Sequence, residues 1–342
     1  MKIVYYVHDL EFPLREGVRK QAWWLATAMK QRGHDVSIVS TSSKRRDFIE
    51  KEGVQITYGS PLSFRKVKAD VIHYISHPTP LILPMLASAQ AERQLMTLFD
   101  GNLNGFWRRI WSPLTTGLVK RNVNIVTVQT DYQTSLLRQH LSLPVQQVPP
   151  LVPTFSPQKH RATQPTILVM THLHSSKGIT DVITAFKLLR LRMPQARLII
   201  ADSGLTKNTF LAKRIERMHR KNIFLKKIVQ PDIELAHAWL YVYPVREAQE
   251  TFSVPLSLIE AQQVGTPAIA TNVGGIPEYF PSEMLVPPKN SAILAKKMYL
   301  FLTDPVVFPM KKNIDNNVVV DTFIRLYKFR KTPAAIAGNP SL

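Results

Sequence analysis

Hydrophobic runs and polar loops alternate along the chain in a repeated strand–helix order. Residues 2–7 form a short apolar run typical of a buried strand, and a polar loop follows it. Apolar positions at helical spacing then extend over 17–32, and a second strand is predicted over 36–40. The chain therefore opens with a strand–helix–strand unit, which favours a parallel sheet.

The same alternation continues to the end of the chain, with one interruption. Further strands are predicted over 71–75, 95–98, 125–128, 166–170, 197–201, 223–225, 240–243 and 268–271. Residues 153–165 are rich in proline and polar residues and are predicted to be a linker. The fold class is therefore α/β, with two Rossmann-like parallel-sheet domains over 1–152 and 166–317 that face a central cleft. A final helix over 318–332 is expected to pack back on the first domain.

Length and composition agree with two domains. At 342 residues with 45% hydrophobic residues, the chain is long enough to bury two cores. The absence of cysteine excludes disulfides, thiolate catalysis and cysteine-based zinc sites. No apolar run approaches the roughly 18 residues of a membrane span, and no cleavage site follows the first residues. A cytoplasmic protein is expected.

The net charge changes the picture of its partners. A formal charge of +20 attracts nucleotide phosphates, anionic lipids or nucleic acid, and it also suits a plain solvated surface. Trp23 and Trp24 lie among Arg15, Arg19 and Lys20, which predicts a face for an anionic membrane, so a peripheral location at its inner face is one interpretation. The alternative is that the tryptophans extend the core stripe of their helix. No module for reading nucleic acid is present, so nucleic acid is not an expected partner.

Three glycines lie where a parallel sheet binds its ligands. Gly17 opens the first predicted helix, and Gly274 and Gly275 follow the strand at 268–271. Helix N-termini and bare backbone amides bind diphosphate groups, although glycine also serves ordinary turns. No GxGxxG follows the first strand and no P-loop is present, which disfavours dehydrogenases and P-loop kinases.

Residues 243–278, YPVREAQETFSVPLSLIEAQQVGTPAIATNVGGIPE, carry the most specific pattern. They resemble the donor-site signature of retaining glycosyltransferases of the glycosyltransferase-B fold. These group 1, or family 4, enzymes include phosphatidylinositol mannosyltransferases and the sucrose and glycogen synthases. The positions that match the signature in order are Pro244, Glu250, Phe252, Glu260, Ala261, Gly265, Pro267, Gly274, Gly275 and Glu278.

The resemblance implies separate roles for two carboxylates. Glu260 would accept hydrogen bonds from the nucleotide ribose, and Glu250 would contact the donor hexose, because carboxylate oxygens accept several hydroxyl bonds. The two glutamates stand ten residues apart here and usually eight apart in the family, so Glu247 is an alternative to Glu250. The plain alternative is that these are exposed loop and helix acids.

A second match, over residues 166–186, supplies cationic groups. Lys177 and Gly178 correspond to the family's Lys-Gly at the start of a helix, and His172 stands where the family has arginine. The resemblance implies that Lys177 and His172 neutralise the leaving diphosphate, since a histidine donates hydrogen bonds to phosphate. A solvated lysine and a loop histidine bonded to backbone are the alternatives.

The amino-terminal half matches the family more loosely and would bind the acceptor. Phe99 stands where the family often has a histidine, directly before Asp100. His77 follows a predicted strand and would face the cleft, or else serve as a structural histidine. His77 and Asp100 are therefore the acceptor-side candidates.

The resemblance implies a retaining, metal-independent transfer of a hexose from a UDP- or GDP-sugar to a hydroxyl acceptor, either a lipid-linked glycan or a polysaccharide. Such a transfer depends on stabilising the leaving diphosphate, and it needs no cofactor besides the nucleotide sugar. No Asp-x-Asp metal motif is evident. Two alternatives remain: a non-catalytic protein that binds nucleotide sugars or polyanions, and a sugar-nucleotide epimerase.

Overall fold

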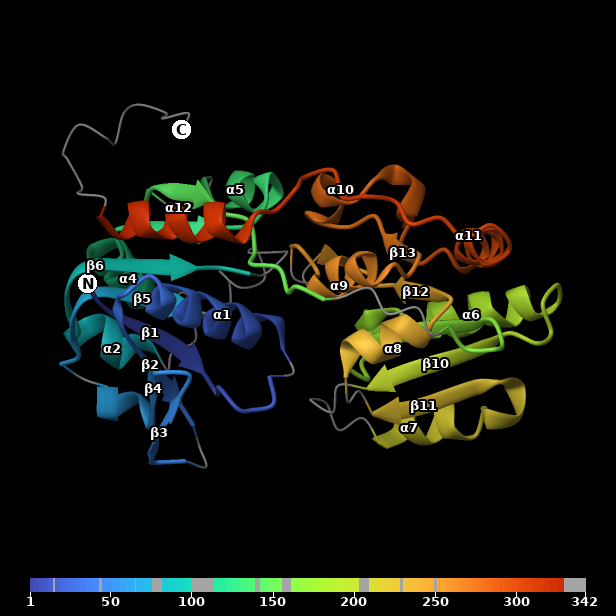
Figure 1. Ribbon diagram of the computed structural model, residues 1–342, viewed down its shortest axis with the longest axis horizontal. Coiled ribbons are helices and arrows are strands. Elements are labelled where there is room, and N and C mark those ends of the chain that lie inside the picture. Colours follow the sequence, from blue (N-terminus) through green and yellow to red (C-terminus); the bar gives the residue numbers. More distant parts are fainter. Residues whose placement is uncertain are drawn as a thin grey trace. The chain divides into compact units, whose positions relative to one another are not determined.

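The chain divides into two compact units. The computed structural model describes residues 1–14, 16–42, 45–64, 66–75, 82–99, 113–138, 142–155, 161–202, 209–227, 230–248, 251 and 253–328. The first unit is Met1–Leu151 with the described residues from Ile314 onward, and the second is Val152–Asn313 (Figure 1). The segment predicted as a linker is thus counted with the second unit.

The described residues of the first unit build one eight-stranded sheet in the order β3-β4-β2-β1-β5-β6-β7-β8. Its strands are β1 Lys2–His8, β2 Asp35–Thr41, β3 Phe48–Lys51, β4 Val54–Gly59, β5 Lys68–Ile75, β6 Gln90–Thr97, β7 Ile125–Val128 and β8 Val145–Gln147. Neighbouring strands are parallel except for the antiparallel edge pair β3–β4. The edge strand β3, its neighbour β4 and the short edge strand β8 were not predicted from the sequence.

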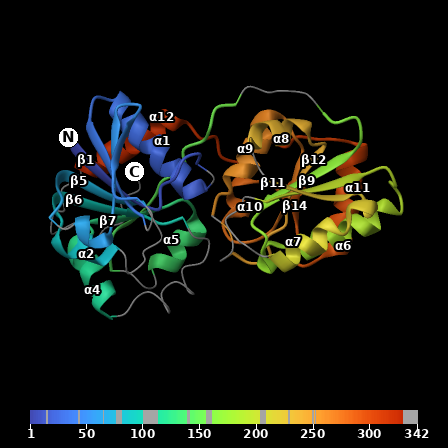
Figure 2. The same cartoon turned by 90° about the horizontal axis from the view of Figure 1, so that it is seen from below.

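Helices cover both faces of this sheet. They are α1 Gly17–Gln31, α2 Leu83–Ser88, α4 Pro113–Asn122, α5 Asp131–Arg138 and α12 Asn316–Lys328. Figure 2 shows α1 and α12 on one face, with α2 and α4 on the other. The five central residues of β1 are buried, as a strand covered on both faces requires.

The first helix buries the predicted apolar stripe together with one of its two tryptophans. Val18, Leu25 and Met29 are buried, and so is Trp23, which is 5% exposed. The rings of Trp23 and Phe12 pack edge to face with their centroids 5.1 Å apart. Trp23 therefore belongs to the core, and the idea that it forms part of a lipid-facing surface is wrong.

The described residues of the second unit build a six-stranded, fully parallel sheet in the order β11-β10-β9-β12-β13-β14. Its strands are β9 Thr166–Thr171, β10 Arg197–Asp202, β11 Ile223–Lys227, β12 Leu240–Tyr243, β13 Ala268–Thr271 and β14 Leu285–Val286. Its helices are α6 Ile179–Arg190, α7 Thr209–Glu216, α8 Pro231–His237, α9 Leu256–Val264, α10 Ile276–Tyr279 and α11 Ser291–Thr303. The predicted α/β class is confirmed, with one sheet fully parallel and the other parallel apart from the β3–β4 pair.

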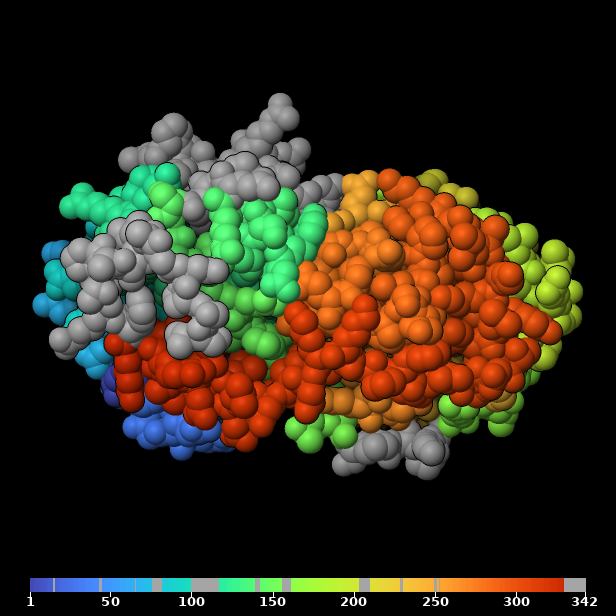
Figure 3. Space-filling model, turned by 90° about the horizontal axis from the view of Figure 1, so that it is seen from above, coloured from blue at the N-terminus to red at the C-terminus, as the bar shows by residue number. Residues whose placement is uncertain are grey.

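The C-terminal helix α12 packs on the first unit, although it follows the whole second unit in sequence (Figure 3). At its surface, Arg32 of α1 donates a 2.6 Å hydrogen bond to Asp321. Beneath it, the hydroxyl of Tyr327 lies 2.8 Å from Nδ1 of His73 and 3.0 Å from the hydroxyl of Tyr5. Burial lowers the pKa of His73 to about 3, so this imidazole is neutral. Buried polar bonds thus hold α12 against β1 and β5.

Among the described residues, the helices are too short or too polar for any of them to cross a bilayer.

Candidate functional site

The second sheet has a reversal of strand order beside its central strand. After β9 the chain adds β10 and β11 on one side, and it then crosses over to add β12, β13 and β14 on the other. In open parallel sheets, ligands bind at the carboxyl ends of the strands where the order reverses in this way. The loops that follow β9, β12 and β13 are therefore the candidate site.

The loop after β9 is a tight turn that ends at Lys177. A 3-10 turn, Ser175–Lys177, is held by the side chain of His174, which accepts a hydrogen bond from the backbone N–H of Ser176. The carbonyl of His172 accepts the backbone N–H of His174 at 2.8 Å. Lys177 is half-buried and stands two residues before α6 begins, so it precedes the helix rather than opening it.

Gly178 allows this turn to touch the loop after β12. Its φ of +70° is left-handed, and a Cβ at this position would overlap the carbonyl oxygen of Pro244. The backbone N–H of Arg246 also donates to the carbonyl of Ser176 at 3.1 Å. The two loops therefore pack backbone against backbone, and only glycine fits at the contact.

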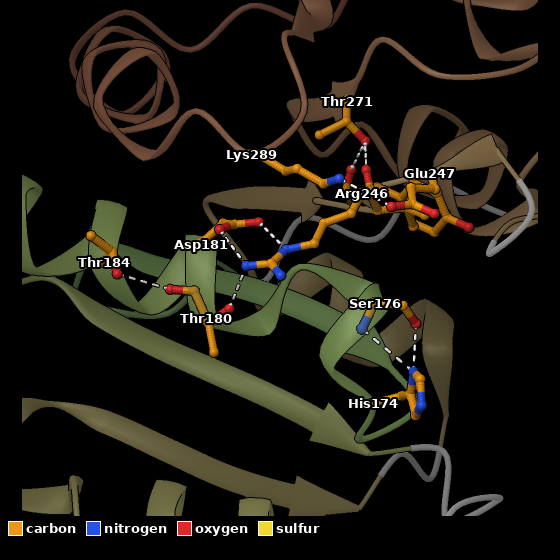
Figure 4. Close-up of polar contacts among 11 residues, drawn as sticks. His174, Ser176, Thr180, Asp181, Thr184, Arg246, Glu247, Thr271 and Lys289 are labelled. Atoms are coloured by element: carbon orange, nitrogen blue, oxygen red, sulfur yellow. Dashed lines mark hydrogen bonds and ion pairs between the residues drawn. The ribbon is translucent and has the colours of Figure 1, made fainter.

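Arg246 fastens the same two loops through its side chain (Figure 4). Its Nε and Nη2 atoms donate to the two carboxylate oxygens of Asp181, in the first turn of α6, at 2.7 and 2.8 Å. Nη2 also donates to Oγ1 of Thr180 at 2.8 Å. The hydrogen bond to Asp181 is the main reason why the pKa of Arg246 is raised. This pair was not predicted from the sequence, where its signal is an arginine two residues after Pro244 and an acid three residues after Gly178.

Two further contacts hold the loop after β12 from its other side. The hydroxyl of Thr271, at the end of β13, donates to the carbonyl of Val245 at 2.5 Å. Glu247 accepts from Nζ of Lys289 at 3.0 Å, and both side chains are about half exposed. Glu247, the alternative sugar contact, therefore lies in a solvated ion pair at this edge of the sheet.

Glu260 is almost entirely buried. It lies in α9 and is 2% exposed, so its interpretation as an exposed helix acid is wrong. It lies near Tyr241, whose pKa is raised by burial and further by the charge of Glu260. The hydroxyl of Tyr241 donates to Ser257 of the same helix at 2.8 Å. A buried carboxylate is costly unless polar groups form hydrogen bonds to it, and the hydroxyl groups of a bound ligand are suitable partners for Glu260.

Two of the predicted glycines lie in the turn after β13, and the third begins α1. Gly274 has a left-handed φ of +56°, and Gly275 precedes α10, so both lie in the turn after β13. Gly17 begins α1 in the first unit, next to Glu16. Arg19, two residues further on, pairs with Glu16 at 3.3 Å and with Asp9 at 3.1 Å.

Several predicted residues lie outside the described part of the chain. They are His77, Asp100, Glu250 and Phe252. Of the predicted donor-site residues, the structure brings Lys177 and Gly178 next to the loop that leads to Glu250. The roles of these residues stay predictions. Within the described ranges, no three His, Asp or Glu side chains are grouped so as to hold a metal ion.

Known proteins resemble the chain both in sequence and in fold. Residues 154–319 match the family model described as "Glycosyl transferases group 1". One subunit of the human phosphatidylinositol N-acetylglucosaminyltransferase is 25% identical, over 93% of this chain and 72% of its own length. A glycosyltransferase from Rickettsia africae has the same fold, with a TM-score of 0.66 at 14% identity over 96% of this chain and 97% of that one. Anabaena HepE in complex with UDP-glucose gives 0.65 at 14% identity, over 89% and 90%.

Proposed function

We infer that this chain is a group 1 glycosyltransferase of the glycosyltransferase-B fold, an enzyme that transfers a sugar from a nucleotide sugar. We propose further that it is a retaining hexosyltransferase that needs no metal ion. The acceptor is the hydroxyl group of a lipid-linked glycan or a polysaccharide, and no cofactor is required beyond the donor. The contact between the Lys177 turn and the loop after β12, at the reversal of strand order, carries this proposal.

The chemistry follows from where charge develops. As the glycosidic bond to the diphosphate breaks, negative charge grows on the leaving oxygen, and fixed cations and amides stabilise it. Lys177 is the main cation and His172 a second donor, with the amides of Gly274 and Gly275 in support. Glu260 binds the ribose, and Glu250 or Glu247 orients the hexose so that the acceptor attacks from the face that the diphosphate leaves.

The relatives suggest which donor to test first. HepE was solved with UDP-glucose, and the human relative is named for the transfer of N-acetylglucosamine to phosphatidylinositol. We therefore propose a UDP-hexose as donor, with GDP-sugars as the second choice, and a lipid-linked hydroxyl as acceptor. For such an acceptor, the enzyme works in the cytoplasm at the inner face of an anionic membrane, which its charge of +20 favours. Cosedimentation with phosphatidylglycerol vesicles at low salt, and its loss at high salt, tests that location.

The donor is tested by thermal shift with UDP-glucose, UDP-N-acetylglucosamine and GDP-mannose. A ligand at 100 times its Kd stabilises the protein by about 2.7 kcal/mol. We expect one nucleotide class to raise the melting temperature, with a much smaller rise in Lys177→Ala. Lys187→Ala is the matched control, because Lys187 is an exposed lysine on α6. A stabilisation that both variants retain would contradict the role of Lys177.

The stereochemistry and the metal requirement are tested on the product. Proton NMR of the glycoside formed from an α-linked donor should show an α anomer, and turnover should persist in EDTA. A β product would contradict the retaining mechanism, and activity that returns only when Mg²⁺ or Mn²⁺ is added would contradict metal independence.

A further inference from the structure

We propose that Arg246 is a positioning residue for the donor diphosphate: it neutralises Asp181, so that the anion meets Lys177 without an opposing carboxylate. This inference rests on the proposed function. It concerns a residue pair that joins the loop after β12 to the first turn of α6.

Asp181 is a natural residue for its position and a poor neighbour for the ligand. A carboxylate in the first turn of a helix interacts favourably with the helix dipole. It lies only four residues after Lys177, however, in the first turn of the helix that follows the Lys177 turn, and its side chain is 15% exposed. A diphosphate drawn to Lys177 would be repelled by this carboxylate if its charge were uncompensated.

The geometry makes the compensation complete. The guanidinium presents its fork to both carboxylate oxygens, and such bidentate pairs are among the strongest charge-assisted bonds. Arg246 is also near the charge of Glu247, but Glu247 is paired with Lys289 (Figure 4). The charge of Arg246 is therefore directed at Asp181, and the pair is close to neutral.

The backbone contact and the side-chain contact of Arg246 are separable. Its N–H donates to the carbonyl of Ser176 whatever the side chain, and Gly178 still touches Pro244. A change of side chain therefore alters the charge beside Lys177 and leaves the main packing of the two loops in place. This separation makes the electrostatic role testable.

The test is isothermal titration with UDP and with uridine, and likewise with GDP and guanosine, because only the diphosphates carry the charge at issue. The variants are Arg246→Met, Asp181→Asn, the double variant and Arg246→Lys. Lys226→Met is the matched control, since it removes a cation paired with Glu234 elsewhere in the same unit. Circular dichroism establishes that each variant is folded.

We expect Arg246→Met to bind the nucleoside diphosphate on the order of tenfold more weakly, the effect of one uncompensated charge near a phosphate after screening. Nucleoside binding should not change. The double variant should recover most of the affinity for the nucleoside diphosphate, because without the Asp181 carboxylate there is no negative charge left to compensate. Arg246→Lys should fall between wild type and Arg246→Met, since lysine keeps the charge but lacks the fork.

Three results would overturn the inference while leaving the proposed function intact. They are an equal loss for diphosphate and nucleoside, a double variant as weak as Arg246→Met, and a loss no greater than that of Lys226→Met. If Arg246→Met does not fold, the diphosphate and nucleoside affinities of the double variant and of Arg246→Lys are compared with the same expectations. A wild-type protein that binds neither UDP nor GDP would refute the proposed function, and this inference would fall with it.

Discussion

Replacing Gly178 by alanine tests the contact on which the candidate site depends. The left-handed φ of +70° alone costs a side chain roughly 1–2 kcal/mol. The new Cβ would also overlap the carbonyl oxygen of Pro244 and lie 2.8 Å from its carbonyl carbon, where ordinary contacts begin at 3.4 Å. Backbone atoms cannot rotate away, so we add the roughly 1–3 kcal/mol typical of overpacking. The unfolding free energy of Gly178→Ala is therefore expected to be about 2–5 kcal/mol lower than that of wild type.

Gly265→Ala is the matched control, because it separates the two contributions. Gly265 has a φ of +80°, and a Cβ there meets nothing within 4 Å, so only the backbone penalty of about 1–2 kcal/mol applies. For a unit of this size, each kcal/mol lowers the melting temperature by about 2–4 °C. Differential scanning calorimetry should therefore show Gly178→Ala melting several degrees below Gly265→Ala.

Nucleotide binding provides the second measurement. If the loops separate to admit the methyl group, Lys177 moves with its turn, and affinity for the donor falls in Gly178→Ala but not in Gly265→Ala. Equal melting temperatures together with equal affinities in the two variants would refute the close approach of the Gly178 and Pro244 backbones.

Three other predictions concern buried polar groups. The folded pKa of His73 is depressed to about 3, so the stability that its neutral form contributes is present above its unfolded pKa of about 6.5 and is lost as pH falls toward 3. The unfolding free energy should fall by about 1.4 kcal/mol per pH unit in this range. Urea unfolding at pH 7, 6 and 5 should show this dependence on pH in wild type and not in His73→Gln. Tyr327→Phe leaves the His73 and Tyr5 polar atoms without their shared partner and should lower the unfolding free energy by about 1–3 kcal/mol in the same assay, and no change would mean that this network does not hold α12. Glu260→Gln should weaken UDP binding at least about tenfold by titration, while the exposed Glu283→Gln should not, and equal affinities would exclude Glu260 from the site.

The strands that support the candidate site were predictable because their signals are local. Residues 240–243 and 268–271 are β12 and β13 as expected, and β9 extends the predicted strand by one residue. An apolar run between turn residues is readable without knowledge of its neighbours. The short or solvated strands β3, β8 and β14 lack such a run, since their neighbours in the sheet rather than their own burial define them. In β4, buried Val54 and Ile56 alternate with exposed polar residues, so no continuous apolar run marks this strand.

Local patterns in the chain were enough to predict the two α/β repeats, the glycines in the loops and helix starts after strands, and the family pattern around Glu260. Three contacts could be found only in the folded protein: Arg246 with Asp181, Gly178 with Pro244, and Tyr327 with His73 beneath α12. The reason is physical. Periodicity and turn chemistry act over a few residues, whereas these contacts join residues 65 to 254 positions apart and exist only because β9 lies beside β12 and the last helix returns to the first sheet.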